Sequence, residues 1–126
     1  MSKEDVNRDV SQLKPEMQIL VEKIYRNVIV HHQLPMGLFE GKRSQERQQW
    51  LYDNKYSRTL NSNHKDGGAV DFAYYYDGKW SWDDDKLHYF DFLGARVIEL
   101  YGDRIEWGGK CFGSFIDKPH FQLKMK

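Results

Sequence analysis

The sequence predicts an α+β domain built on a mainly antiparallel sheet. Helix-like and strand-like patterns alternate along the chain without the repeated strand–helix–strand order that is typical of parallel sheets. Two strand-like runs are joined by Asp77-Gly78, a pair that favours a β-hairpin. The 126 residues are the usual length of one domain. We therefore expect a single domain over residues 1–126, in which residues 1–12 form an N-terminal arm.

The first half of the chain predicts two helices and a short strand. A helix is expected over residues 15–30, because Pro15 suits a first helical position and apolar residues then recur at helical spacing. These apolar residues are Met17, Leu20, Val21, Ile24 and Val28. The apolar residues 34–40 are interpreted as a strand. Ser44 can cap a second helix over residues 45 to about 54.

The second half predicts most of the sheet. Residues 57–68 are polar and are expected to form a loop. Residues 69–76 are rich in β-forming types and are expected to make the hairpin with residues 79–82. Later strands are expected over residues 105–107 and 119–125. In the last of these, Phe121, Leu123 and Met125 alternate with polar residues.

A third helix is expected to begin at Asp83, Asp84 and Asp85, because negative charge is favourable at a helix N-terminus. Its predicted buried face consists of Leu87, Phe90, Leu93, Val97 and Tyr101. A calcium site is the alternative interpretation of the three aspartates.

The composition excludes several classes of protein. Hydrophobic residues make up 40% of the chain and aromatic residues 15%, which is too many for a disordered segment. With 19 basic and 19 acidic residues the net charge is zero, so no nucleic-acid partner is expected. No apolar run approaches the roughly 18 residues of a membrane span, and no secretory signal is present. The single cysteine, Cys111, excludes an intramolecular disulfide, and we interpret it as an incidental free thiol.

Two polar segments contain residue types that bind zinc. His64 and Asp71 belong to the first segment, and Asp117 and His120 belong to the second. A catalytic zinc site uses three protein ligands of imidazole or carboxylate type and leaves a fourth position for water. His64, Asp71 and His120 would supply these ligands, and Asp117 would be free to move a proton. On spacing alone, the alternative is that they are ordinary surface or core residues.

The order of these residues resembles a known family. The first segment has the form Ser-x-His-x-x-Gly-x-Ala-x-Asp over residues 62–71, which resembles the first metal motif of the peptidase M15 family. The Asp117-x-x-His120 pair is similar to the second motif of that family. Trp107-Gly108-Gly109 and the arginine-bearing residues 40–48 resemble its phage endolysin branch. We interpret Trp107 itself as a core residue, with lining of a cleft as the alternative.

The resemblance extends over residues 13–123 and implies a Hedgehog/DD-peptidase-like fold. It implies that His64, Asp71 and His120 bind Zn²⁺ and that Asp117 is the catalytic acid/base. It further implies that Arg43 contacts the substrate or stabilises the developing oxyanion. Ser62 is expected to bind substrate, with capping of the loop as the alternative.

The family comprises D-alanyl-D-alanine dipeptidases, carboxypeptidases and phage L-alanyl-D-glutamate endopeptidases. The resemblance therefore implies a zinc-dependent peptidase that cleaves an amide bond in the stem peptide of bacterial peptidoglycan, with L-alanyl-D-glutamate as the expected bond. The alternatives are a D,D- or L,D-carboxypeptidase of the same family and a non-catalytic zinc-bearing interaction module.

The sequence also gives expectations about assembly and location. We expect a monomer without a cell-wall-binding domain and without stable insertion into a membrane. As an endolysin it would remain in the host bacterial cytoplasm until a membrane pore admits it to the cell wall.

Overall fold

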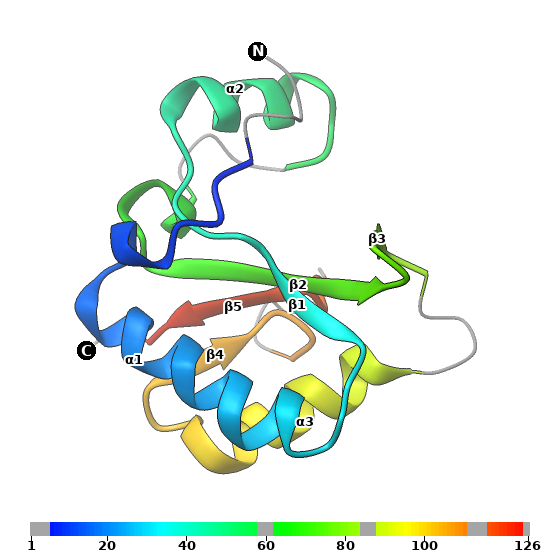
Figure 1. The fold of residues 1–126 in the computed structure, drawn as a ribbon. Coiled ribbons are helices and arrows are strands. Elements are labelled where there is room, and N and C mark those ends of the chain that lie inside the picture. The colour runs from blue at the N-terminus through cyan, green and yellow to red at the C-terminus, as the bar shows by residue number, and fades with distance from the viewer. Residues whose placement is uncertain (1–5, 58–61, 84–87, 111–115, 125–126) are drawn as a thin grey trace.

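The structure is a computed structural model that describes residues 6–57, 62–83, 88–110 and 116–124. Within these residues a five-stranded antiparallel sheet has the order β1-β2-β5-β4, and β3 pairs with β2 (Figure 1). The predicted α+β class with a mainly antiparallel sheet is confirmed. The strands are β1 (Met36–Glu40), β2 (Ala69–Tyr76), β3 (Lys79–Ser81), β4 (Ile105–Trp107) and β5 (His120–Leu123).

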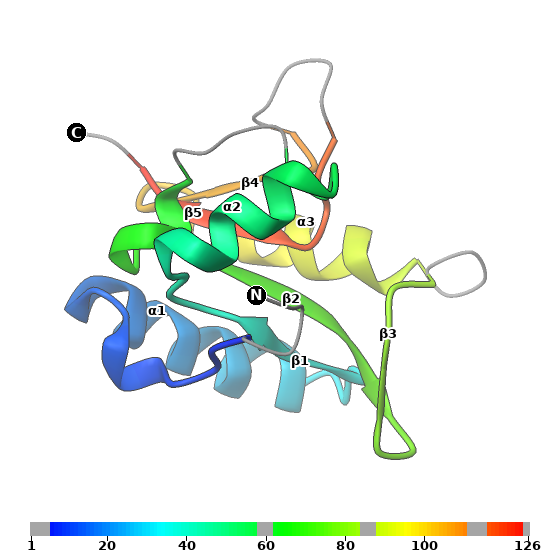
Figure 2. The same ribbon diagram turned by 90° about the horizontal axis from the view of Figure 1, so that it is seen from above.

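The helices lie on both sides of this sheet. Helix α1 (Pro15–Ile24) continues into the π-helix η3 (Tyr25–Val30), and together they cover one face with α3 (Tyr89–Tyr101). Helix α2 (Gln45–Asp53) lies on the opposite side of the sheet (Figures 1 and 2). The described residues also form two 3-10 helices, η2 (Val10–Gln12) and η4 (Asn63–Asp66).

The hydrophobic core fills the space between the sheet and the layer of α1, η3 and α3. The apolar stripe predicted for residues 15–30 is fully buried there, and so are the described members of the stripe predicted for α3. Strands β1, β2, β4 and β5 contribute apolar side chains from one face only. The strand side chains in this core are Met36, Leu38, Val70, Phe72, Tyr74, Ile105, Trp107 and Phe121.

The start of the third helix was predicted wrongly. Helix α3 begins at Tyr89 rather than at Asp83, because His88 has a left-handed backbone (φ 55°) through which an α-helix cannot continue. Asp83 therefore lies outside the helix. Asp84, Asp85 and Leu87 lie outside the described residues, as does Cys111.

Other predicted boundaries differ by a few residues. Residues 15–30 are helical throughout, but the last six form a π-helix. Strand β1 begins after Pro35, whose carbonyl accepts a hydrogen bond from the backbone of Tyr75 (2.8 Å). The predicted loop 57–68 contains η4, and the strand predicted over residues 119–125 is confirmed over His120–Leu123. Ser44 caps α2 as predicted, its hydroxyl accepting from the backbone N–H of Arg47 (3.0 Å).

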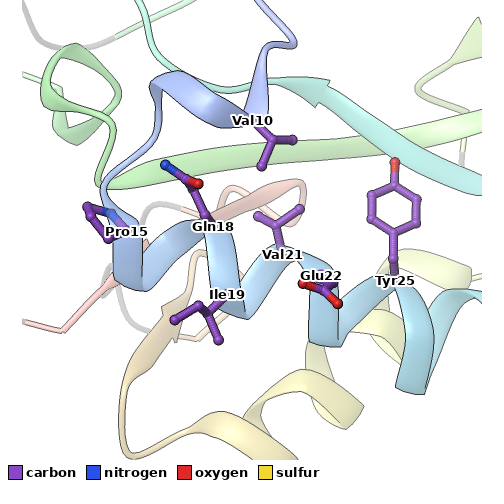
Figure 3. A pocket seen from close by; sticks show the side chains of 7 residues that line it. All are labelled: Val10, Pro15, Gln18, Ile19, Val21, Glu22 and Tyr25. Atoms are coloured by element: carbon purple, nitrogen blue, oxygen red, sulfur yellow. The ribbon is translucent and has the colours of Figure 1, made fainter.

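A pocket lies beside α1 (Figure 3). It is lined by Val10, Pro15, Gln18, Ile19, Val21, Glu22 and Tyr25, none of which is a predicted site residue. Within the part of the chain that the structure describes, no helix has the length and apolar character needed to cross a membrane.

Candidate metal centre

Two of the predicted ligands face each other across neighbouring strands. Asp71 on β2 pairs directly with His120 on β5 in the antiparallel register. Residues opposite one another in such a pair have their side chains on the same face of the sheet, close enough to interact. Asp71 Oδ1 lies 3.3 Å from His120 Nδ1. The pairing of β2 with β5 therefore brings together two of the three predicted ligands.

The third predicted ligand, His64, reaches the same point from η4. The hydroxyl of Ser62 accepts a hydrogen bond from the backbone N–H of His64 (3.2 Å), and Gly67 ends the turn with a φ of 82°. A Cβ atom at Gly67 would also lie 2.9 Å from the backbone nitrogen of Lys14, so only glycine fits this return of the chain. As a result, His64 Nε2 lies 3.3 Å from Asp71 Oδ1.

Hydrogen bonds determine which nitrogen of each imidazole faces this cluster. His64 Nδ1 lies 2.8 Å from the carbonyl oxygen of Gly41, so Nδ1–H donates and Nε2 keeps its lone pair. In His120 the opposite nitrogen faces the cluster. Its Nε2 lies 2.8 Å from Gln122 Oε1, and its Nδ1 points toward Asp71. Gln122 is held in turn by Glu106, whose Oε1 accepts from Gln122 Nε2 (3.3 Å).

The three side chains fit a zinc ion. Among the described residues, His64, Asp71 and His120 form a group whose ligand atoms all lie within 4.8 Å of one another. Zinc prefers imidazole nitrogen and carboxylate oxygen, and two ligands of a tetrahedral ion lie roughly 3.3 Å apart. His64 Nε2 is buried and has no hydrogen-bond partner in the described part of the chain. A buried nitrogen of this kind is costly unless a ligand such as a metal ion satisfies it.

The close packing of charges changes the pKa values in the cluster. Burial alone would raise the pKa of Asp71, but the imidazoles of His64 and His120 hold it well below its usual range. Burial opposes the charged form of His120, yet the hydrogen bond and the negative charge of Asp71 raise the pKa of this imidazole. Asp71 is therefore ionised at neutral pH, and a proton on His120 must leave before Nδ1 can bind a metal ion.

Asp117 lies in the segment that leads from β4 into His120. Its backbone N–H donates to the carbonyl of Gly108 (2.9 Å), and its own carbonyl accepts from the backbone N–H of His120 (3.1 Å). A Cβ atom at Gly108 would lie 2.1 Å from the carbonyl oxygen of Asp117, so this approach requires glycine. The indole of Trp107 donates from Nε1 to the carbonyl of Lys118 (2.7 Å) and is only 4% exposed, which confirms its predicted place in the core.

The carboxyl group of Asp117 is half-buried within the electrostatic reach of the cluster. Burial raises its pKa, and the negative charge of Asp71 raises the pKa further, whereas His120, His64 and Arg43 act in the opposite direction. A raised pKa brings this carboxyl group closer to the pH range in which a general acid/base must both accept and return a proton.

Arg43 is buried beside Asp71, in the segment between β1 and α2. Its Nη2 donates to Glu40 Oε1 (2.8 Å) and lies 3.4 Å from Asp71 Oδ2, and its Nη1 donates to Gln48 Oε1 (2.8 Å). Its Nε is buried without a hydrogen-bond partner among the described residues. Arg47 of α2 donates from Nε to the other oxygen of Glu40 (3.0 Å), so Glu40 joins the two arginines.

The structure thus gathers the residues that the sequence analysis had selected. His64, Asp71 and His120 meet at one point, and Arg43 and Asp117 lie close enough to influence the charge there. Ser62 caps η4, which was the alternative to its predicted contact with substrate. That the three ligands bind zinc, and that Arg43, Ser62 and Asp117 act on a substrate, stay predictions.

Sequence reasoning assigned no role to the residues that hold the predicted ones in place. Glu40 and Gln48 fix Arg43, and Gln122 fixes His120. For Gln122 a signal was available, because residues two apart on a strand share a face, and Gln122 is two residues from a predicted ligand. Glu40 belongs to the arginine-bearing segment of residues 40–48, but its hydrogen bond to Arg43 across the turn between β1 and α2 was not predicted.

Comparison with known proteins shows which family the chain is similar to. Residues 55–123, more than half of the chain, match the sequence profile of a peptidase M15 family described as D-alanyl-D-alanine carboxypeptidase. The crystal structure of the L-Ala D-Glu endopeptidase ChiX of Serratia marcescens is 28% identical, with a TM-score of 0.73 over 92% of this chain and 84% of that one. No protein of curated function shows significant sequence similarity.

Two more distant structures share the fold. The LD-carboxypeptidase LdcB is 12% identical, with a TM-score of 0.61 over 94% of this chain and 63% of that one. The D,D-pentapeptidase VanY of a VanB-type vancomycin resistance cassette, in complex with Zn(II), is 17% identical, with a TM-score of 0.54 over 94% of this chain and 72% of that one. In this chain, too, an antiparallel sheet forms the centre of the fold, and it carries the His–Asp–His cluster on the face opposite the core. The match of residues 55–123 to the family profile places the chain in the peptidase M15 family.

Proposed function

We propose that this protein is a zinc-dependent endopeptidase that hydrolyses the L-alanyl-D-glutamate bond in the stem peptide of bacterial peptidoglycan. The observation that carries the proposal is the cluster of His64, Asp71 and His120, in which the buried Nε2 of His64 makes no hydrogen bond with the described residues and lies 3.3 Å from Asp71 Oδ1. The similarity to an L-Ala D-Glu endopeptidase over most of both chains supports the choice of bond.

The roles of the residues follow from their places in the cluster. When zinc is bound, it supplies a water molecule that loses its proton near neutral pH and a positive charge next to the scissile carbonyl. Asp117 accepts the proton from the attacking water and later returns it to the leaving amine. Gln122 and the carbonyl of Gly41 keep the two imidazoles oriented, each through the nitrogen that faces away from the ion.

Arg43 is suited to act on the substrate mainly through its charge, because its side chain is buried beside Asp71. Its Nη2 is already engaged by Glu40 and Asp71, and its Nη1 is engaged by Gln48. The positive charge of the guanidinium, held beside Asp71, would favour the carbonyl oxygen as that oxygen gains negative charge, which stabilises the transition state. A carboxypeptidase would instead use a cation to hold the terminal carboxylate of its substrate, most strongly through a two-pronged contact. The engagement of Nη2 therefore favours the endopeptidase over a D,D- or L,D-carboxypeptidase.

The test is the digestion of purified peptidoglycan, followed by identification of the new termini by mass spectrometry. The proposed reaction creates a new amino terminus on glutamate and a new carboxyl terminus on alanine. A carboxypeptidase would release a single terminal amino acid, and a non-catalytic module would release nothing. Either of those results contradicts the proposal.

Metal dependence is tested on the same substrate. Removal of zinc by a chelator should abolish cleavage, and added zinc should restore it. The matched control compares His120→Ala with His31→Ala, since His31 is exposed and lies outside the cluster. Only His120→Ala should lose both zinc and activity.

We further propose that the protein acts as an endolysin that reaches the cell wall from the host cytoplasm through a membrane pore. Bacteria that express it should remain intact until their inner membrane is permeabilised, and then lyse. Cells that express Asp117→Asn should survive the same treatment. Lysis without permeabilisation would show that the protein crosses the membrane by another route.

A further inference from the structure

Aromatic side chains gather in a second region of the sheet. Four of them form a chain of contacts: the ring centroid of Phe39 lies 5.3 Å from that of Trp80 and 4.8 Å from that of Trp82, and that of Tyr75 lies 4.6 Å from that of Trp80. The guanidinium group of Arg8 lies 4.9 Å from the ring centre of Phe39 and 4.8 Å from that of Trp80. We call these five residues the aromatic platform.

The platform lies on the same face of the sheet as the metal centre. Along β2, Phe72 and Tyr74 point into the hydrophobic core, so Asp71 and Tyr75 point to the opposite face. Trp80 is directly opposite Tyr75 in the β2–β3 register and therefore shares this face.

A β-bulge brings Phe39 to the platform. The register of β1 against β2 shifts between Leu38, which faces the core, and Glu40, which pairs with Asp71. Phe39 is the extra residue of this bulge, and its ring contacts Trp80 and Trp82 instead of the core. The same irregularity presents Glu40 to the buried arginines beside the metal centre.

Two of the four aromatic side chains of the platform are exposed at the surface. Tyr75 is 46% exposed and Trp82 is 49% exposed. Clusters of large apolar side chains at a protein surface mark binding sites more often than single exposed residues do. Because Arg8 stacks on two of the rings and the rings pack on each other, the surface is already ordered, which lowers the entropy cost of binding.

The platform lies along β2 from the metal centre, at a distance that a bound substrate can span. Tyr75 is four residues along β2 from Asp71, which corresponds to about 13 Å on an extended strand. A substrate that extends from the metal centre along this strand would pass over the platform. In the proposed substrate, the alanine of the scissile bond joins the stem peptide to an amino sugar of the glycan chain.

Sugar rings match the chemistry of this surface. The C–H faces of a pyranose ring pack on the faces of aromatic rings, while indole N–H, phenol O–H and guanidinium groups hydrogen-bond to hydroxyl and acetamido oxygens. Stacked nucleotide bases would also use aromatic rings, but such sites lie in positively charged grooves. The net charge of zero gives no support for that alternative.

We infer that the aromatic platform is a glycan-binding subsite, which holds the amino-sugar chain of peptidoglycan while the attached stem peptide lies at the metal centre. The inference rests on the proposed function, since it assigns the sugar-bearing part of the same substrate. It predicts that the enzyme cleaves stem peptides attached to sugar better than free stem peptides.

The experiment has two measurements on the zinc-loaded protein. The first is calorimetric titration with a β-1,4-linked oligomer of N-acetylglucosamine, which contains no peptide. The second is the ratio of kcat/KM for a disaccharide-linked stem peptide to that for the same peptide without sugar. Each is made on the parent protein, on Trp82→Ala and Tyr75→Thr, and on Phe92→Ala as a control, because Phe92 is 42% exposed on α3, away from the platform.

The parent protein should bind the oligomer, and the two platform variants should weaken this binding roughly tenfold or more. The same variants should lower the kcat/KM ratio by a similar factor, whereas Phe92→Ala should leave binding and ratio unchanged. Zinc content and the melting temperature establish that each variant is folded. If the oligomer does not bind, or if the variants reduce both peptide substrates equally, the platform is not a glycan subsite. The titration does not require cleavage, so failure of the proposed peptidase function would be seen separately.

Discussion

Gln122 shows how one neutral side chain sets the chemistry of a predicted ligand. The amide oxygen of Gln122 accepts a hydrogen bond from His120 Nε2–H, and Glu106 fixes the orientation of the amide. Nδ1 of His120 is thereby directed at Asp71 and the ligand cluster. Such outer partners of ligands normally contribute strongly to metal affinity.

Replacement of Gln122 by leucine should therefore weaken zinc binding by roughly 10–100-fold, without loss of any of the three predicted ligands. Competition with a zinc-binding dye measures the affinity. Gln49→Leu is the matched control, since Gln49 is exposed on α2 and bonds only to Asp53 among its described contacts. An affinity for Gln122→Leu equal to that of the parent would show that the hydrogen bond to His120 is dispensable.

Asp117 is expected to move a proton without binding the metal. Asp117→Asn keeps the shape of the side chain but removes its ability to accept a proton. The variant should fold normally and retain zinc, while its turnover falls by roughly 10²–10⁴-fold. Elemental analysis and steady-state kinetics on the stem peptide measure the two properties. Loss of zinc would make Asp117 a ligand, and near-parental turnover would assign the proton transfer to another group.

At the scale of the elements, the turn after β4 explains why Trp107, Gly108 and Gly109 occur together. Gly94 of α3 leaves space for the indole of Trp107, since a Cβ atom there would lie 2.0 Å from the ring. Gly108 allows the segment that contains Asp117 to approach β4, and Trp107 holds the same segment through Lys118. The Trp107-Gly108 pair thus positions the segment that contains Asp117.

Gly108→Ala should displace the Asp117 segment, because the added methyl group would lie 2.1 Å from the Asp117 carbonyl oxygen. We expect a loss of turnover of at least roughly 10²-fold, the lower end for a misplaced proton-transfer group, with a smaller effect on zinc content. Gly78→Ala in the β2–β3 turn is the control: its φ of 73° makes alanine unfavourable by about 1–2 kcal/mol, but no atom lies within 4 Å of the new methyl group. Equal activities of the two variants would contradict the positioning role.

The elements differ in how well the sequence predicts them. Helices α1 and α2 and strand β2 have strong local signals, namely a proline or serine at the first turn, a helical apolar stripe, or a run of β-forming residues. The start of α3 was missed because the left-handed backbone of His88 is a tertiary feature, and histidine gives no sequence signal for it. The aspartates at residues 83–85 suggested an earlier start by their charge alone.

At the scale of the whole molecule, the predicted zinc ligands come from segments that are distant in the sequence. The spacing of His64, Asp71 and His120 could suggest a site, but only the register of β2 with β5 and the turn at Gly67 bring the side chains together. The surrounding buried network of Glu40, Arg43 and Gln48 depends on the same tertiary arrangement and could not be predicted from spacing. A metal ion at this point would connect η4, β2 and β5.

Zinc should therefore stabilise the entire fold, and the effect should depend on pH. Zinc at about 100 times its dissociation constant stabilises the native state by about 2.7 kcal/mol, which corresponds to a rise in melting temperature of roughly 10 °C for a domain of this size. Because Asp71 raises the pKa of His120, a proton competes with zinc for Nδ1 at a higher pH than for an ordinary histidine. The zinc-induced rise should consequently be full above this raised pKa and become smaller as the pH falls through it. Calorimetric melting of chelator-treated protein, with and without zinc at several pH values, measures the effect. His64→Ala should abolish the rise and His31→Ala should preserve it, and a rise that grows as the pH is lowered would be incompatible with imidazole ligands.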